Sequence, residues 1–321
     1  MQRSASGRAA RRGAPRRRRP GLAAALAACA CLLGALAAPL RGQDNERALF
    51  VSVLDEDGAP VPDLAPHEFV VEEDGIEREV LRAGPARSAM QVAVLVDTSA
   101  SAAFAIRDIR NGLERLIPVL AEGNDVALIS YGGPPRVLVE STRRLERLRD
   151  GIGLVFSYPE SAAYLLDALV ETARGFERRE APRPAIVVVA SEGLDFSRYD
   201  YRRTHEALQA SGVAAHVVVV QERGNTALRA DPFQFSGDVL QRDRALAQLP
   251  EATGGQRYDL LLSTAVPDAM DALAEVMTNQ YRVVYSRPPG LIPPETVSVR
   301  MRRTDLTARG TPDRWTGDGS P

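Results

Sequence analysis

The chain of 321 residues is 45% hydrophobic and carries a formal net charge of −2, which suits one large globular domain with attachments or two modest domains. The charge is uneven, because residues 1–43 hold nine arginines and no acidic residue. Residues 44–321 therefore carry 31 of the 40 basic residues and all 42 acidic ones, a net charge of −11. An excess of negative charge argues against non-specific binding to nucleic acid and to anionic membrane surfaces.

Residues 1–43 have the form of a secretory signal or an N-terminal anchor. A stretch rich in arginine ends at Arg19, and an apolar run of about 20 residues follows. Ala35 and Ala37 form an A-x-A cleavage site, which favours removal, whereas LAAC ending at Cys29 resembles a lipoprotein cleavage box. Whether the segment is a cleaved signal, a lipoprotein signal or an anchor, its basic residues precede the apolar run. We therefore expect a secreted, periplasmic or envelope protein that contacts a membrane only through this segment. Cys31 also lies here, so the rest of the chain has no disulfide.

Residues 44–88 predict a small β module. Short apolar runs alternate with polar residues, and Asp74-Gly75 between two such runs predicts a two-residue hairpin turn, whose central residues need positive φ. About forty residues of strand bury little core by themselves. We therefore expect this module to form a sandwich-like unit or to lie on the next domain.

Residues 89–286 predict a doubly wound α/β domain. The apolar runs MQVAVLV, DVALISY, AIVVVAS and AAHVVVV indicate buried strands, and the segments between them have helical periodicity. Strands of nearly continuous Val, Ile and Ala are typical of a mostly parallel sheet with helices on both faces. Residues 221–237 predict a long polar surface loop. Gly254-Gly255 indicates the end of a helix before a strand at residues 256–259.

Residues 287–321 predict a C-terminal β extension. QYRVVYS and ETVSVRM predict two strands joined as a hairpin by a proline-rich link, and the residues after Thr307 predict a frayed tail.

Three oxygen-bearing side chains follow the first buried strand of the predicted α/β domain: Asp97, Ser99 and Ser101. In doubly wound sheets, ligands bind at the carboxyl ends of the strands. One carboxylate and two hydroxyls at alternate positions suit Mg²⁺, which prefers oxygen ligands and keeps waters in its other positions.

Asp97-Thr98-Ser99-Ala100-Ser101 resembles D-x-S-x-S, the first element of the metal-ion-dependent adhesion site of the von Willebrand factor type A family. GNDVALISYG, LLDALVETA and IVVVASEG are similar to that family's later landmarks, and the flanking β pieces with the QYRVVY strand resemble a bacterial secreted subfamily. The resemblance implies a Rossmann-like fold and a non-enzymatic adhesion module. Its Mg²⁺, or Mn²⁺ or Ca²⁺, would bridge to an exposed Asp or Glu of a partner protein.

The chain departs from the family's metal site at two positions. Ala163 stands where the family has a threonine, and Glu192 stands where it has the aspartate of S/T-D-G. Losing a supporting group at a metal site costs about 10–100-fold in affinity for the metal. A water could take the place of the threonine hydroxyl, and Ser161 and Asp195 lie near the two altered positions and could supply the missing oxygen. We therefore predict metal ligands at Asp97, Ser99, Ser101 and Glu192. The alternative is that the serines only cap the first helix and that the chain is a metal-independent interaction scaffold.

A hydrolase is the rival class, and the sequence argues against it. Ser99 lacks a G-x-S-x-G context, no D-x-D follows the first strand, and His67, His205 and His216 lie in segments that predict surface or core positions. We expect no enzymatic activity.

Overall fold

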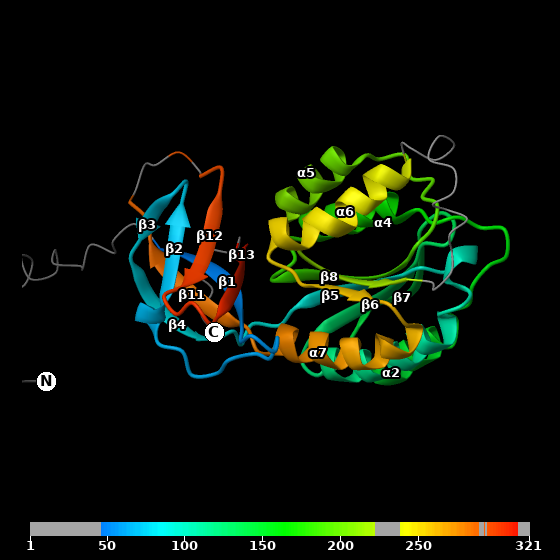
Figure 1. Ribbon diagram of the computed structural model, residues 1–321, viewed down its shortest axis with the longest axis horizontal. Coiled ribbons are helices and arrows are strands. Elements are labelled where there is room, and N and C mark those ends of the chain that lie inside the picture. Colours follow the sequence, from blue (N-terminus) through cyan, green and yellow to red (C-terminus); the bar gives the residue numbers. More distant parts are fainter. Residues whose placement is uncertain (1–45, 222–237, 289–291, 293, 314–321) are drawn as a thin grey trace, which may run out of the picture. The chain divides into compact units, whose positions relative to one another are not determined.

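The computed structural model describes residues 46–221, 238–288, 292 and 294–313. They form a six-stranded sheet with helices on both faces and two smaller antiparallel sheets (Figure 1). The predicted signal segment and residues 222–237 of the predicted loop lie outside the described residues. No helix in the described part of the chain combines the length and the apolar character needed to cross a membrane.

The large sheet has the strand order β10-β9-β8-β5-β6-β7, and every neighbouring pair is parallel except β6 with β7. Its strands are β5 (Gln91–Val96), β6 (Asp125–Ser130), β7 (Arg136–Thr142), β8 (Pro184–Ser191), β9 (Ala214–Val220) and β10 (Arg257–Leu260). The helices are α2 (Ile106–Ala121), α3 (Leu145–Ile152), α4 (Leu165–Arg178), α5 (Tyr201–Ser211), α6 (Asp238–Thr253) and α7 (Val266–Thr278), with 3-10 turns η2 (Ala100–Ala102) and η3 (Ser263–Ala265). The predicted doubly wound, mostly parallel fold is confirmed.

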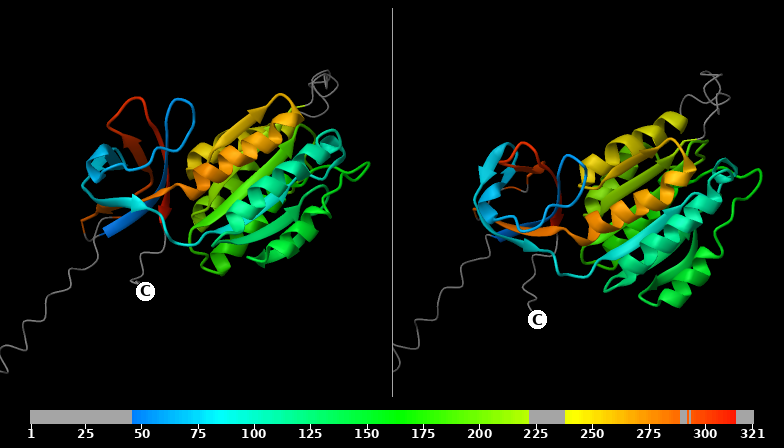
Figure 2. Two further views of the ribbon diagram at one scale, coloured as in Figure 1. Left: turned by 90° about the horizontal axis from the view of Figure 1, so that it is seen from below. Right: turned by 60° about the horizontal axis from the view of Figure 1, so that its bottom comes forward.

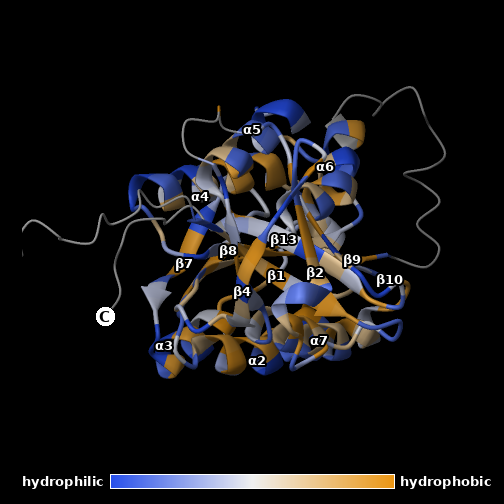
Figure 3. Cartoon of the chain, turned by 90° about the vertical axis from the view of Figure 1, so that its left-hand side faces the viewer, coloured by the Kyte–Doolittle hydropathy of each residue, from blue (hydrophilic) through white to orange (hydrophobic). Residues whose placement is uncertain are grey.

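The strands are buried because helices cover both faces of the sheet. α2, α3 and α7 pack on one face, where α2 and α7 lie side by side (Figure 2), and α4, α5 and α6 pack on the other. β8 and β9 are buried along almost their whole length, as expected for parallel strands between two helical layers. In Figure 3 the helices show both blue and orange, as amphipathic helices do.

The two smaller sheets join strands from the two ends of the described chain. One has the order β13-β1-β11-β4 and the other β12-β2-β3. Their strands are β1 (Glu46–Leu54), β2 (Phe69–Glu73), β3 (Ile76–Arg78), β4 (Val80–Pro85), β11 (Tyr281–Ser286), β12 (Val297–Met301) and β13 (Thr307–Asp313), with a 3-10 turn η1 (Pro66–Glu68) before β2. Asp74 and Gly75, at φ 50° and 78°, make the predicted two-residue turn between β2 and β3.

The C-terminal strands differ from the prediction. β11, predicted to end the domain of residues 89–286, pairs instead with β1 and β4. β11 and β12 do not pair with each other as a hairpin, because β12 pairs with β2. Residues 307–313 are not a frayed tail but form β13, which pairs with β1. The reason is burial, because β1 is buried through its centre and needs a partner strand on each side. Within the core that these strands share, the rings of Tyr281 and Phe69 pack edge to face with their centroids 5.4 Å apart.

Candidate functional site

Asp97 lies directly after β5, at the point where the chain order reverses across the sheet, between β8 and β6. Its carboxylate is buried. The Ser99 N–H donates to Oδ1 at 2.9 Å, and the Ser191 N–H at the end of β8 donates to Oδ2 at 3.2 Å. Two backbone donors thus hold the carboxylate in one orientation and leave each oxygen able to accept one more bond.

The hydroxyls of Ser99 and Ser101 do not cap a helix. Ser99 precedes the turn η2 without a side-chain capping bond, and α2 begins later, after Ala105, which has none either. Among the described residues neither hydroxyl takes part in a hydrogen bond. The Asp97 carboxylate caps the Ser99 N–H instead, so the prediction that the serines serve only as caps is wrong.

Close backbone packing fixes the loop that carries these residues. A Cβ on Gly132 would overlap the backbone of Thr98 and Ser99, and one on Gly193 would overlap the Ser101 side chain. The Gly132 N–H also donates to the Thr98 hydroxyl at 3.0 Å. Only glycine permits these approaches. They bring Ser101 against the loop after β8, next to Glu192.

The half-buried Glu192 sits between Ser191 and Gly193, and among the described residues its carboxylate has no hydrogen bond or ion pair. The carbonyls on either side of it both accept from the guanidinium of Arg242 on α6: Gly193 O at 2.8 Å, and Ser191 O. Arg242 is 1% exposed. Burying a guanidinium is costly unless it is hydrogen-bonded or paired, so this arginine has a specific structural task in positioning the Glu192 loop.

Arg242 was missed by sequence reasoning, although a signal for it exists. It lies three, four and seven residues before Ala245, Leu246 and Leu249, which face the core. This spacing places Arg242 on the buried face of α6. An arginine on that face is unexpected and therefore indicates a side chain with a specific buried partner.

The two residues predicted as substitutes near the altered positions 163 and 192 are both engaged elsewhere. Asp195 accepts the N–H of Leu165 at 2.8 Å and that of Ser197 at 2.9 Å, and burial raises the pKa of its carboxyl. The Ser161 hydroxyl donates to Tyr158 O at 2.7 Å. Ala163 itself is buried, and its N–H and C=O are bonded to Leu194 and Phe196. Its backbone therefore supplies no ligand either.

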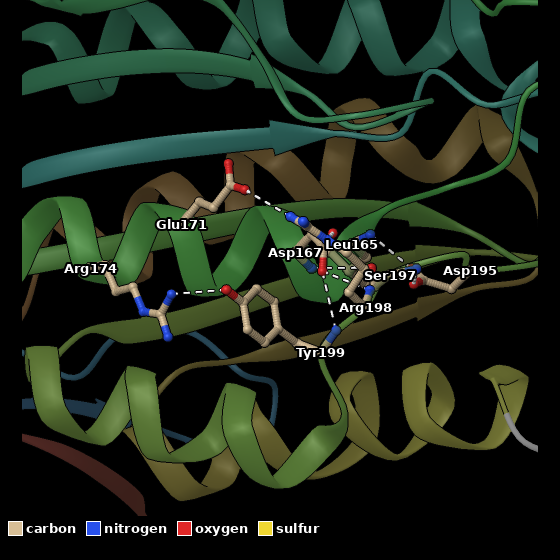
Figure 4. A network of polar contacts seen from close by, with 8 residues as sticks. All are labelled: Leu165, Asp167, Glu171, Arg174, Asp195, Ser197, Arg198 and Tyr199. Atoms are coloured by element: carbon tan, nitrogen blue, oxygen red, sulfur yellow. Dashed lines mark hydrogen bonds and ion pairs between the residues drawn. The ribbon is translucent and has the colours of Figure 1, made fainter.

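The loop after β8 is clamped onto the start of α4 (Figure 4). Asp195 caps Leu165, and the buried Asp167 accepts the N–H groups of Arg198 at 2.9 Å and Tyr199 at 3.2 Å. Carboxylates near a helix N-terminus are favourable because of the helix dipole and the unpaired N–H groups there. This clamp fixes the loop that leaves the Asp97 site and explains why Asp195 is not available there.

Two large buried side chains, Tyr131 and Arg242, interact electrostatically with the acidic residues of this region. Tyr131 donates its hydroxyl to Val189 O at 2.8 Å, and burial, followed by the negative charge of Asp97, raises its pKa well above the ordinary value. The Arg242 charge acts on both Tyr131 and Asp195 in the opposite sense. Tyr131 is therefore a neutral phenol that feels the charge of Asp97, and Arg242 is a buried cation near Asp195.

The donor set fits a hard cation in part. Asp97, Ser99, Ser101 and Glu192 offer oxygen donors, and Mg²⁺ completes its shell with waters, but position 163 has no oxygen. Within the described residues no three His, Cys, Asp or Glu side chains gather as metal ligands, so any cation here depends on the two serines.

The three histidines occupy surface or core positions, as the sequence predicted. His205 stacks on Tyr201 with ring centroids 5.8 Å apart, His216 is buried in β9 with Nδ1 accepting the Gln256 N–H, and His67 lies in η1. In the part of the chain that is described, none of them forms a hydrogen bond with Asp97 or Ser99.

A doubly wound sheet with an antiparallel edge strand, together with a D-x-S-x-S element at the end of β5, defines a domain that resembles the von Willebrand factor type A class. No protein-family model matches the sequence, and no curated protein matches it.

Solved structures that match the chain include von Willebrand factor type A domains. The conserved hypothetical protein BatB from Bacteroides thetaiotaomicron is 15% identical, with a TM-score of 0.42, over 60% of this chain and 100% of that one. A von Willebrand factor type A protein from Catenulispora acidiphila is 13% identical, with a TM-score of 0.46, over 87% of this chain and 76% of that one. The von Willebrand factor domain of the type V pili tip protein Mfa5 from Porphyromonas gingivalis is 12% identical, with a TM-score of 0.43, over 60% and 96%. At these identities and scores the fold assignment rests on this chain's own strand order.

Proposed function

We propose that this chain is a non-enzymatic protein-interaction module that acts outside the cytoplasm, and that the edge of the sheet carrying Asp97 is its binding site. The observation that carries the proposal is the orientation of the buried Asp97 carboxylate by two backbone N–H groups, beside two serine hydroxyls that cap nothing. Buried polar groups normally have hydrogen-bond partners, and the Ser99 and Ser101 hydroxyls have none among the described residues, which supports a ligand beside the Asp97 carboxylate.

The ligand we propose is Mg²⁺, or alternatively Mn²⁺ or Ca²⁺, held by Asp97, Ser99, Ser101 and Glu192. The cation would supply an open position that accepts the carboxylate of an Asp or Glu on a partner protein. Water fills the place of the missing threonine oxygen, because Mg²⁺ retains waters readily. We expect weaker metal binding than a full set of protein ligands would give.

Calorimetric titration of Mg²⁺ and of Mn²⁺ into the purified protein tests this proposal. We expect saturable binding that is lost in Asp97→Asn, which keeps the side-chain volume and removes the charge. Asp125→Asn is the matched control, because Asp125 lies at the start of β6, the other end of a neighbouring strand, where it pairs with Arg143 at 3.1 Å. Equal binding in wild type and Asp97→Asn contradicts the assignment of the site.

The carboxylate bridge needs a test of its own. A short peptide with a single aspartate, added to the Mg²⁺-loaded protein, should bind more tightly than the same peptide with asparagine. The difference should vanish when the metal is removed with a chelator. A peptide preference that survives the chelator would show a binding site that needs no metal.

The second candidate function is a metal-independent interaction scaffold, which one observation favours. Arg242 already places a fixed positive charge next to the Glu192 loop and close enough to influence Asp195, and a cation beneath the site opposes the entry of a divalent ion. Absence of calorimetric binding at millimolar metal in the wild type selects this second function.

A further inference from the structure

The face of the sheet that carries α4 is only partly covered. α4, α5 and α6 pack on β5, β8 and β9, whereas the outer strands β6 and β7 extend beyond them on this face. A groove of about 610 Å³ lies here, bounded by α4 and by β5, β6 and β7. It shares no lining residue with the Asp97 site.

The floor of this groove is apolar. On β6, Val126 and Leu128 belong to the core of the opposite face, so Ala127 and Ile129, which alternate with them, line the groove. Both are only half-buried, and Val137 of the edge strand β7 is 49% exposed. Apolar surface left open in the middle of a sheet is unfavourable in water, which indicates that a ligand covers it.

One wall of the groove is cationic. Arg174 and Arg178 of α4 line it together with Arg179, which directly follows the helix, and none of them forms an ion pair with a described residue. Like charges four residues apart on a helix repel each other, so the pair Arg174 and Arg178 lowers the stability of α4.

Aromatic contacts hold two of these guanidiniums in place. Arg174 donates to the Tyr199 hydroxyl at 2.9 Å and lies 5.2 Å from that ring, as Figure 4 shows in part, and Arg179 lies 5.5 Å from the ring of Phe176. The acidic lining residues are Glu140 and Glu171, and Glu171 approaches Arg198 on the same side at 3.9 Å. Cationic groups therefore predominate on the wall beside α4.

We infer that this groove is a second binding site, which takes an amphipathic organic anion. The apolar body of the ligand lies on Ala127, Ile129 and Val137, and its anionic head meets the guanidiniums of α4. The volume falls in the range of about 300–1,000 Å³ that small-molecule sites occupy. Arginine is suited to the head, because its planar fork binds carboxylate, sulfonate or phosphate oxygens in pairs.

The fluorescent anion 8-anilinonaphthalene-1-sulfonate is the probe for the test, titrated into the folded full-length chain. Competitors that share a dodecyl chain and differ in the head group separate charge from apolarity. Dodecanoate should displace the probe, whereas dodecyl maltoside and dodecyltrimethylammonium should not, each below its micelle concentration. Equal displacement by all three would show a general apolar surface and overturn the inference, as would no probe binding at about 1 mM.

Paired variants locate the site. The double variant Arg174→Gln with Arg178→Gln should weaken probe binding by about tenfold or more, because it removes two charge-assisted contacts. The matched control is Arg147→Gln with Arg149→Gln, two exposed arginines of α3 on the other face of the sheet, which should leave the affinity unchanged. Val137→Glu should also weaken binding by placing an anion on the floor. Equal losses in the α4 and α3 double variants, with unchanged circular dichroism, would overturn the inference.

Discussion

Arg242 and Gly193 are joined by a hydrogen bond of 2.8 Å, in which a buried guanidinium on α6 donates to a carbonyl in the loop after β8. A second bond from the same group reaches Ser191 O, so the carbonyls of the residues before and after Glu192 are both bonded to this guanidinium. A helix that follows the Asp97 element by more than a hundred residues thereby sets the position of the proposed fourth metal ligand.

Arg242→Met should destabilise the protein by roughly 3 kcal/mol, because it leaves two buried carbonyls unpaired and removes the cation near Asp195. Urea unfolding followed by circular dichroism measures the change. The neighbouring exposed Arg244 is the control, and Arg244→Met should cost less than about 1 kcal/mol. Similar losses in the two variants would show that the buried bonds contribute little.

Ala163→Thr should strengthen Mg²⁺ binding. The substitution adds a hydroxyl at the position where the resemblance implies a ligand, and restoring a supporting group is expected to raise affinity by about tenfold or more. Calorimetry on the folded variant measures this, with thermal unfolding as the check on packing, since Ala163 is 1% exposed. Ala163→Val tests the oxygen itself, because valine has the shape and nearly the volume of threonine but no hydroxyl to bind the metal. A gain in Val equal to that in Thr would rule out coordination by the hydroxyl.

Gly132→Ala should lower the free energy of unfolding by about 1–3 kcal/mol, because a Cβ there overlaps the backbone of Thr98 and Ser99. The shift of the Asp97 loop should weaken metal binding as well. Gly84→Ala in β4 is the control, since a Cβ there meets nothing within 4 Å. Chemical denaturation of both variants decides the point, and an unaffected Gly132→Ala would mean that the loop adapts without loss.

His216 should make stability depend on pH. Burial, followed by the charge of Arg309, lowers the pKa of His216 from 6.5 to about 4 in the folded state. The unfolded chain therefore binds the proton more readily, so the stabilisation is fully present above pH 6.5 and is lost as the pH falls towards about 4. The loss should reach roughly 3 kcal/mol.

His216→Asn is the control for this pH dependence, because its amide oxygen can still accept the Gln256 N–H that His216 Nδ1 accepts. Unfolding free energies measured from pH 7 to pH 4 should fall less steeply in the variant. Asp195 does not produce the effect, because its raised pKa favours the folded state as the pH falls. Parallel curves for the two proteins would be evidence against a neutral buried His216.

The sequence alone was enough to predict the elements whose signals are local. Continuous apolar runs predicted β5, β6, β8 and β9, helical periodicity between these runs predicted α2 and α4, and Asp74-Gly75 predicted its turn. The position of Asp97 after the first strand followed from the same pattern, because the carboxyl end of a buried strand is where a doubly wound sheet presents its ligands.

Only the tertiary structure decided the partners. The partners of β1 come from the far end of the chain. The hydrogen bonds of Asp195 and Ser161, and the contact of the Arg242 guanidinium with the loop that carries Glu192, likewise depend on the folded structure. The periodicity of a strand predicts that one face is buried, but it does not identify the neighbouring element. An arginine is normally exposed to water, but it can be buried when carbonyl groups accept hydrogen bonds from its guanidinium. Local patterns therefore determined the elements, and long-range packing and hydrogen bonding determined the site.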